Sequence, residues 1–177
     1  MAKFLSDVKT LRENARKNLR KGSITDAYGA DLPRVLEVLQ QSLATELICV
    51  LRYQQHSFAA RGLDSEAVAA EFLAHSREEQ GHAELIAARI GQLGGDPDFN
   101  PDTFSGRAHS EYKTATSLTD MIKENLIAER IAISSYSEII AWLGDGEPTT
   151  RRMLEEILAV EEEHANDMVN LLDDKKS

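Results

Sequence analysis

Apolar residues recur every three or four positions along four long stretches of the chain, which is the spacing of amphipathic α-helices. Asp31 with Pro33, and later Ser117, are typical of helix starts, while Gly62 and Gly144 are typical of helix ends. The chain has no alternating run of β-branched residues, so the pattern predicts an all-α fold. The four expected helices cover about residues 31–60, 65–93, 117–143 and 147–172.

Residues 95–116 interrupt this pattern. Asp96-Pro97, Asn100-Pro101 and Gly106 prevent a helix longer than a turn or two. An irregular connection of this length suits a crossing from one end of a bundle to the other, whereas a short turn makes the last two helices antiparallel neighbours. We therefore expect an antiparallel four-helix bundle over residues 31–177, with a long crossover between its second and third helices.

Residues 1–30 are expected to form a basic helical extension in front of the bundle. An amphipathic helix is predicted here, ended by Gly22-Ser23, and seven Lys or Arg residues lie within residues 1–22. Its apolar stripe needs a partner, so we favour docking on a neighbouring subunit. A basic arm that touches DNA is the alternative. The stripe consists of Phe4, Leu5, Val8, Leu11, Ala15 and Leu19.

Length, composition and net charge limit the functions and the cellular location that can be expected for this chain. A length of 177 residues with 42% hydrophobic residues suits one globular domain with a sizeable core. The net charge of −10 disfavours general nucleic-acid binding and favours the attraction of cations. The single cysteine, Cys49, cannot form an internal disulfide, which indicates a reducing compartment. With no apolar leader and no run of membrane-spanning length, we expect a cytoplasmic protein without a membrane partner.

The four helices contain an internal repeat. Each half carries a lone glutamate, a tyrosine seven positions after it, and a Glu-x-x-His pair. The lone and paired glutamates are 33 residues apart in the first half and 32 in the second. Two such hairpins around a pseudo-twofold axis would bring the repeated side chains together. They are Glu46, Tyr53, Glu79 and His82 in the first half, and Glu129, Tyr136, Glu161 and His164 in the second.

This repeated set has the chemistry of a dinuclear metal site. Residues three apart on a helix share a face, so Glu-x-x-His offers one oxygen and one nitrogen to a single point. Four carboxylates balance two divalent cations, and mixed oxygen and nitrogen ligands suit iron. One such pair alone is weak evidence, but its repetition in register predicts two iron ions per subunit. Without metal, the repulsion should raise the carboxylate pKa values.

Over about residues 31–172 these motifs resemble the ferritin-like superfamily. The resemblance is closest to bacterioferritin and to Dps-like miniferritins with a bacterioferritin-type di-iron centre. It implies terminal ligands at Glu46 and Glu129 and bridging ligands at Glu79 and Glu161. It also implies that His82 and His164 each bind one iron. Tyr53 would place a hydroxyl near the site, with either a catalytic or a packing role, and Tyr136 would be its counterpart.

Departures from the family pattern refine these expectations. Gln80 stands where bacterioferritin has its haem-binding methionine, so haem is not expected. Only thirteen residues follow His164, which leaves little room for the additional short helix of 24-subunit shells and favours twelve subunits. Cys49 is expected to be a small buried hydrophobe. Surface or structural roles are expected for the remaining histidines, which are His56, His75 and His109. For His56, an iron contact is the alternative.

The resemblance implies a ferroxidase. It would oxidise Fe(II) with hydrogen peroxide or dioxygen and deposit ferric mineral in a hollow homo-oligomeric shell, which would protect against oxidative stress. One alternative is a di-iron peroxidase of the rubrerythrin type that stores no iron, although the chain has no Cys-x-x-Cys module. The other is a Dps-type cage whose main partner is DNA.

Overall fold

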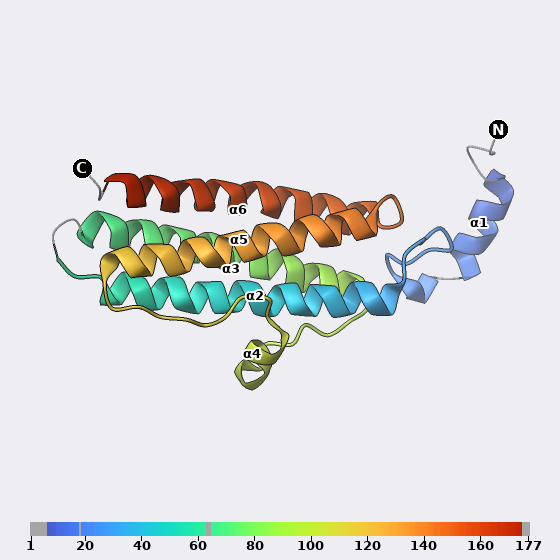
Figure 1. The fold of residues 1–177 in the computed structure, drawn as a ribbon. Coiled ribbons are helices and arrows are strands. Elements are labelled where there is room, and N and C mark those ends of the chain that lie inside the picture. Colours follow the sequence, from blue (N-terminus) through green and yellow to red (C-terminus); the bar gives the residue numbers. More distant parts are fainter. Residues whose placement is uncertain (1–6, 18, 63–64, 175–177) are drawn as a thin grey trace.

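The computed structural model describes residues 7–17, 19–62 and 65–174, and every regular element in these ranges is helical. The all-α prediction is therefore confirmed. Four long helices form the body of the molecule, and a long crossover joins α3 to α5 (Figure 1). The elements are α1 (Val8–Lys17), η1 (Leu19–Lys21), α2 (Leu32–Ala59), α3 (Ser65–Gln92), η2 (Pro101–Thr103), α4 (Phe104–Arg107), α5 (Leu118–Leu143) and α6 (Pro148–Asp174).

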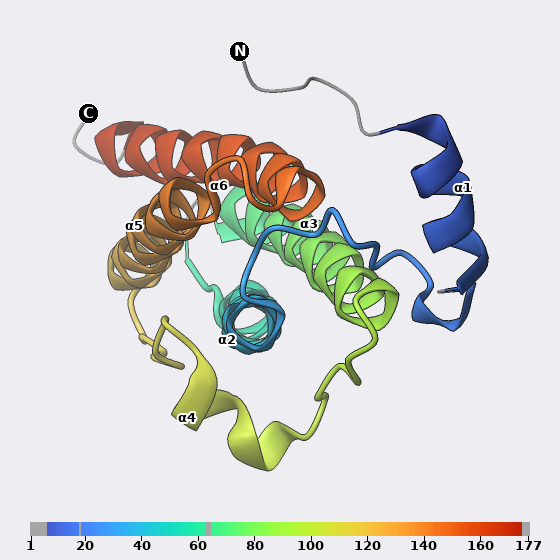
Figure 2. The same cartoon turned by 90° about the vertical axis from the view of Figure 1, so that its right-hand side faces the viewer.

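The long helices begin and end within a few residues of the predicted positions, because the local capping signals are used. The Asp31 side chain accepts a hydrogen bond from the Arg34 amide at the start of α2. Ser117 caps α5 by accepting from the Asp120 amide at 3.1 Å. Gly144 follows α5 with a φ of 49°, a conformation that favours glycine. Helices α2 and α3 pack as one hairpin, and α5 and α6 as the other (Figures 1 and 2).

The crossover from α3 to α5 runs along the outside of the bundle (Figure 1). It is not entirely irregular, since η2 and the single turn of α4 lie within it. Phe104 of α4 inserts into the main hydrophobic cluster. Arg107 donates to the Gln40 carbonyl at 3.1 Å, and the Gln40 side chain donates to the Asp96 carbonyl at 2.7 Å. These contacts attach the crossover to α2.

The apolar core has two parts with a polar layer between them. The larger part includes Leu39, Leu43 and Ile86, and the smaller includes Phe72 and Met168. Burial of such side chains stabilises the bundle by about 1.5–3 kcal/mol each. The repeated glutamates and histidines lie between the two parts, so packed apolar side chains on both sides hold them in place.

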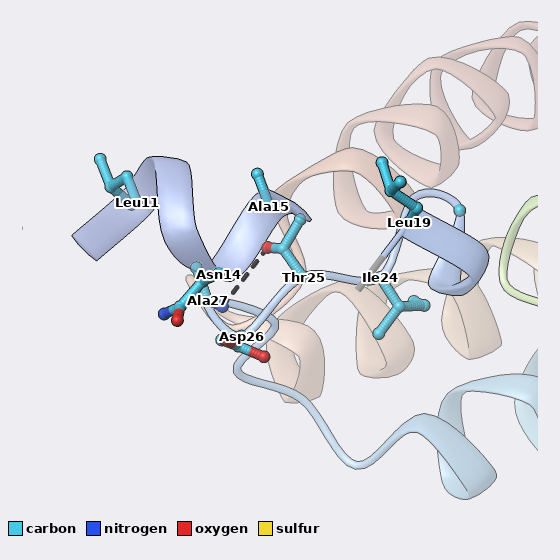
Figure 3. A pocket seen from close by; sticks show the side chains of 9 residues that line it. Leu11, Asn14, Ala15, Leu19, Ile24, Thr25, Asp26 and Ala27 are labelled. Atoms are coloured by element: carbon cyan, nitrogen blue, oxygen red, sulfur yellow. Dashed lines mark hydrogen bonds between the residues drawn. The ribbon is translucent and has the colours of Figure 1, made fainter. Parts of the chain in front are cut away.

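Helix α1 lies beside one end of the bundle, and none of its residues is buried (Figures 1 and 2). A cavity of about 460 Å³ lies between α1 and residues 22–27, and Leu11, Ala15 and Leu19 are among its lining residues (Figure 3). The predicted stripe also includes Phe4 and Leu5, which lie outside the described residues. Its docking on a neighbouring subunit stays a prediction. None of the helices in the described ranges is long and apolar enough to span a membrane.

Candidate metal centre

The six predicted ligands converge in the polar layer of the bundle, and all four long helices contribute. Their possible ligand atoms form two overlapping groups, and within each group these atoms lie within 4.8 Å of one another. Two carboxylates, those of Glu79 and Glu161, belong to both groups, which is the arrangement of two cation positions bridged by two carboxylates. The first group is Glu46, Glu79, His82 and Glu161, and the second is Glu79, Glu129, Glu161 and His164.

These side chains are buried with their polar atoms left without hydrogen-bond partners. None of the six is more than 7% exposed. Among the described residues, eight of their ligand atoms make no hydrogen bond of acceptable geometry, although several lie close together. Buried polar atoms without partners are unfavourable, and bound cations would satisfy them. The donor set therefore fits two iron ions. The eight atoms are Glu46 Oε2, both oxygens of Glu79 and Glu161, Glu129 Oε2, and Nδ1 of His82 and His164.

Two buried tyrosines hold the lone glutamates of the repeat. Tyr53 donates to Glu129 Oε1, and Tyr136 donates to Glu46 Oε1. Each tyrosine thus serves the glutamate of the opposite half, which the repeat alone did not predict. In both carboxylates the second oxygen stays free to face the centre. Tyr53 therefore lies beside the centre as expected, and Tyr136 mirrors it.

Glu78 orients one imidazole of the centre, and sequence analysis missed it. His164 Nε2 lies 2.7 Å from Glu78 Oε2, so Nε2 carries the proton and donates it. When His164 binds a metal ion, its Nδ1 supplies the lone pair, and in the metal-free structure Nδ1 lies 3.5 Å from Glu79 and 3.7 Å from Glu161. The available signal was an acidic residue directly before the Glu-x-x-His motif.

In the absence of metal, the two lone glutamates hold protons tightly. Burial, and then the charge of Glu79, raise the pKa of Glu46 to about 8. Burial, and then repulsion from Glu79 and Glu161, also raise the pKa of Glu129 well above its ordinary value. The expectation of raised carboxylate pKa values is correct for this pair.

The expectation of raised pKa values is wrong for the two shared carboxylates. Burial lowers the pKa of His82, but interactions with Glu161 and other carboxylates outweigh it and raise that pKa to about 12. The pKa of His164 rises to about 11 in the same way. Burial raises the pKa values of Glu79 and Glu161, yet ion pairs with the two imidazolium groups bring both below their ordinary value.

We expect the metal-free protein to lose stability as the pH rises from 6 to 9. The pKa of Glu46 rises from 4.5 to about 8, and that of His82 from 6.5 to about 12, on folding. Between its unfolded and folded pKa values, each group binds more protons in the folded state than in the unfolded state. Its stabilising contribution is therefore complete below the unfolded pKa and is lost as the pH rises toward the folded pKa. The thermal midpoint of chelator-treated protein should fall by about 5 °C or more in calorimetry. Glu46→Gln should flatten part of this decline, and a midpoint that rises with pH would contradict it.

His56 and Cys49, two other candidates from the sequence, are buried side chains whose contacts indicate structural roles. His56 Nε2 accepts from the Ala115 amide at 3.2 Å, and His56 Nδ1 lies 3.0 Å from Asn125 Oδ1. Both ring nitrogens of His56 are thus engaged, and an iron contact there is excluded in this arrangement. Cys49 is 1% exposed, burial raises the pKa of its thiol well above the ordinary value, and its sulfur accepts from the Arg52 guanidinium at 3.4 Å, so its environment is structural.

Two further residues lie away from the six-residue centre. His109 is half-buried in the crossover and lines a surface hollow beside α5. Gln80 donates to Glu84 at 3.1 Å on the outside of α3. His75 proves to be closer to the centre than expected, because its ring stacks on His164 with 3.9 Å between the ring centroids.

Comparisons with known proteins agree with this architecture. A protein family model, the ferritin-like domain, matches residues 36–177. A relative from Pyrococcus furiosus named "DNA protection during starvation protein" is 28% identical over 158 residues, which cover 87% of this chain and 85% of the relative. The bacterioferritin of Desulfovibrio desulfuricans is 26% identical over 132 residues, which cover 74% of this chain and 70% of the relative.

Solved structures extend the similarity to three dimensions. A dodecameric thioferritin, the bacterioferritin-related protein of Bacteroides fragilis, aligns with a TM-score of 0.81 and 27% identity over 96% of this chain and 95% of that chain. The Desulfovibrio desulfuricans bacterioferritin, described with its di-iron site, aligns with a TM-score of 0.72 and 25% identity, covering 82% and 81% of the two chains. On its fold, its repeated motifs and the match over most of its length, the chain belongs to the ferritin-like domain family.

Proposed function

We propose that this protein is a ferroxidase that oxidises Fe(II) at the six-residue centre and stores the ferric product in a hollow shell. The observation that carries the proposal is the pair of overlapping ligand groups that share Glu79 and Glu161. Membership of a family that includes bacterioferritin supports iron storage and oxidoreductase activity in general terms. Fe(II) is the substrate in this proposal.

The residues of the centre have distinct roles. Glu79 and Glu161 bridge the two Fe(II) ions, while Glu46 with His82, and Glu129 with His164, each hold one ion. The tyrosine hydrogen bonds orient the two terminal carboxylates before iron arrives. Each Fe(II) gives up one electron. Hydrogen peroxide takes both electrons with two protons and leaves as two water molecules, which would remove an oxidant from the cell; dioxygen is the alternative oxidant.

A route for Fe(II) opens between α3 and α6. A cavity of about 670 Å³ there reaches both imidazoles of the centre, His82 and His164. Glu71, Glu78, Glu163 and Asp167 also line it, and a carboxylate-lined cavity attracts cations. This opening supports delivery of iron from outside the bundle directly to the ligands.

Iron loading tests the function. Purified shells given Fe(II) with hydrogen peroxide, then separated from free iron by gel filtration, should retain tens of iron ions per chain, because the oxidised product leaves the centre for the shell cavity. Metal analysis of the shell fraction measures this number. A ceiling near two iron ions per chain would favour the rubrerythrin-type alternative, in which iron is not stored.

The shell is proposed to have twelve subunits. The dodecameric Bacteroides protein aligns over 96% of this chain, whereas the bacterioferritin structure aligns over 82%. Light scattering should give a particle mass about 12 times the chain mass of 19.7 kDa. A mass about 24 times that of the chain would contradict the twelve-subunit proposal.

DNA binding is the second candidate function. Six basic residues of α1 and η1 are exposed, and one relative is named for DNA protection. If this surface binds DNA, the shell should retard duplex DNA in a gel at low salt, and neutralisation of the six residues should abolish the shift. A parent shell without retardation would remove DNA from its partners. The six residues are Lys9, Arg12, Arg16, Lys17, Arg20 and Lys21.

A further inference from the structure

A second cluster of potential ligands lies in the cavity between α3 and α6, outside the six-residue centre. Its members are Glu71 and His75 of α3 and Asp167 of α6, and their possible ligand atoms all lie within 4.8 Å of one another. His75 Nε2 is 3.3 Å from Glu71 Oε1 and 3.5 Å from Asp167 Oδ2. Two atoms that ligate one metal ion at about 2.1 Å lie about 3.0–3.4 Å apart. The spacing therefore suits a bound ion.

The hydrogen bonds of His75 leave Nε2 available as a ligand. His75 is only 2% exposed, and its Nδ1 lies 3.2 Å from the Tyr53 hydroxyl oxygen. The Tyr53 hydroxyl donates its hydrogen bond to Glu129, so its oxygen accepts a hydrogen bond from the N–H at His75 Nδ1. In the neutral imidazole, Nε2 then carries a lone pair that faces two carboxylates. That contact is repulsive unless a proton or a metal cation lies between them.

The cluster also lies on the route to the inner centre. The His75 ring stacks on His164, and the cavity that contains the cluster reaches His82 and His164 as well. Glu71 and Asp167 are partly exposed, with side chains 42% and 37% accessible, so an ion can reach them from solvent. Only the His75 ring would separate an ion held here from His164, which is a ligand of the inner centre.

We propose that Glu71, His75 and Asp167 bind a third divalent transition-metal ion, from which iron is delivered to the inner pair. One nitrogen and two carboxylate ligands suit Fe(II) and also Zn(II). The metal site stands on its own geometry, whereas its use for Fe(II) rests on the proposed function.

Zinc counting tests the site without redox chemistry. Equilibrium dialysis of metal-free shells against Zn(II) should show one ion per chain fewer for the Glu71→Gln/Asp167→Asn variant than for the parent. The matched control is Glu156→Gln/Glu162→Gln, which removes two exposed charges of α6 that do not line the cavity and should retain the parental count. Crystals soaked in Zn(II) should show an anomalous peak about 2.0–2.1 Å from His75 Nε2.

Equal zinc counts in the parent and the Glu71→Gln/Asp167→Asn variant, or an equal loss in the control, would overturn the outer site. The Glu46→Gln variant separates the two proposals, since it removes an inner ligand away from His75. It should lose inner zinc and keep the outer ion. Shells that bind outer zinc but do not oxidise Fe(II) would contradict the proposed function alone. Light scattering and the thermal midpoint verify that each variant is assembled and folded.

Discussion

Replacing Glu79 by glutamine is expected to slow Fe(II) oxidation by at least about 100-fold. Residues that merely orient metal ligands change affinity or activity by about 10–100-fold when mutated. Glu79 belongs to both ligand groups, and both of its oxygens lack other partners, so its loss affects both iron positions. Glutamine keeps the shape but removes the charge that balances the two cations. Stopped-flow absorbance of the ferric product measures the rate.

Glu84→Gln provides the matched control for Glu79. Glu84 lies on the same helix, but its side chain is exposed and bonded only to Gln80 among the hydrogen bonds seen. The control should oxidise iron at the parental rate, and both variants should keep the parental particle mass. A Glu79→Gln variant that oxidises iron within about threefold of the parent rate would contradict the bridging role.

The fold was predictable because its signals are local. Ser117 and Gly144 act through their own capping hydrogen bonds and backbone dihedrals, so the sequence around them is enough to place the ends of α5. The convergence of the ligands was predictable for a different reason. The glutamate and histidine motifs occur twice at matching separations, and two similar hairpins that pack around one axis must meet at equivalent positions.

The outer cluster was not predictable by the same reasoning, because it breaks the repeat. Alignment of the two Glu-x-x-His motifs places Met153 opposite Glu71, Ile157 opposite His75 and Leu85 opposite Asp167. None of the three polar residues therefore has a polar counterpart in the other half, and a search for repeated chemistry does not find them. The partners of His75 also come from α2 and α6, and such contacts between helices leave no periodic signal in the sequence.

The lowered pKa values of the shared carboxylates escaped prediction for a related reason. Counting four carboxylates in a bundle core predicts mutual repulsion. The structure adds two imidazolium groups whose pKa values rise to about 12 and about 11, and these compensate Glu79 and Glu161. Charge balance in the metal-free centre thus depends on distances that spacing along the chain does not specify.

Zn(II) is expected to stabilise the metal-free protein strongly, and Glu129→Gln should remove most of that gain. A ligand that binds only the folded state adds about 4 kcal/mol at 1,000 times its Kd, and two inner ions act together. Without metal, burial and two neighbouring carboxylates raise the pKa of Glu129 well above its ordinary value, which keeps the group neutral. A neutral glutamine of the same shape should therefore leave the metal-free midpoint unchanged or raise it.

Glu129→Gln should thus lower the midpoint of the zinc-bound protein relative to the parent, but not that of the metal-free protein. Calorimetry of chelated and Zn(II)-saturated samples should show a metal-free midpoint for Glu129→Gln at or above that of the parent, and a much smaller rise on adding zinc. Glu138→Gln, an exposed change on the same helix, should behave like the parent in both conditions. If Glu129 served only packing, its replacement would lower both midpoints equally and leave the zinc-induced rise intact. That result would show that Glu129 is not a metal ligand, because replacement of a ligand must reduce the stabilisation that zinc provides.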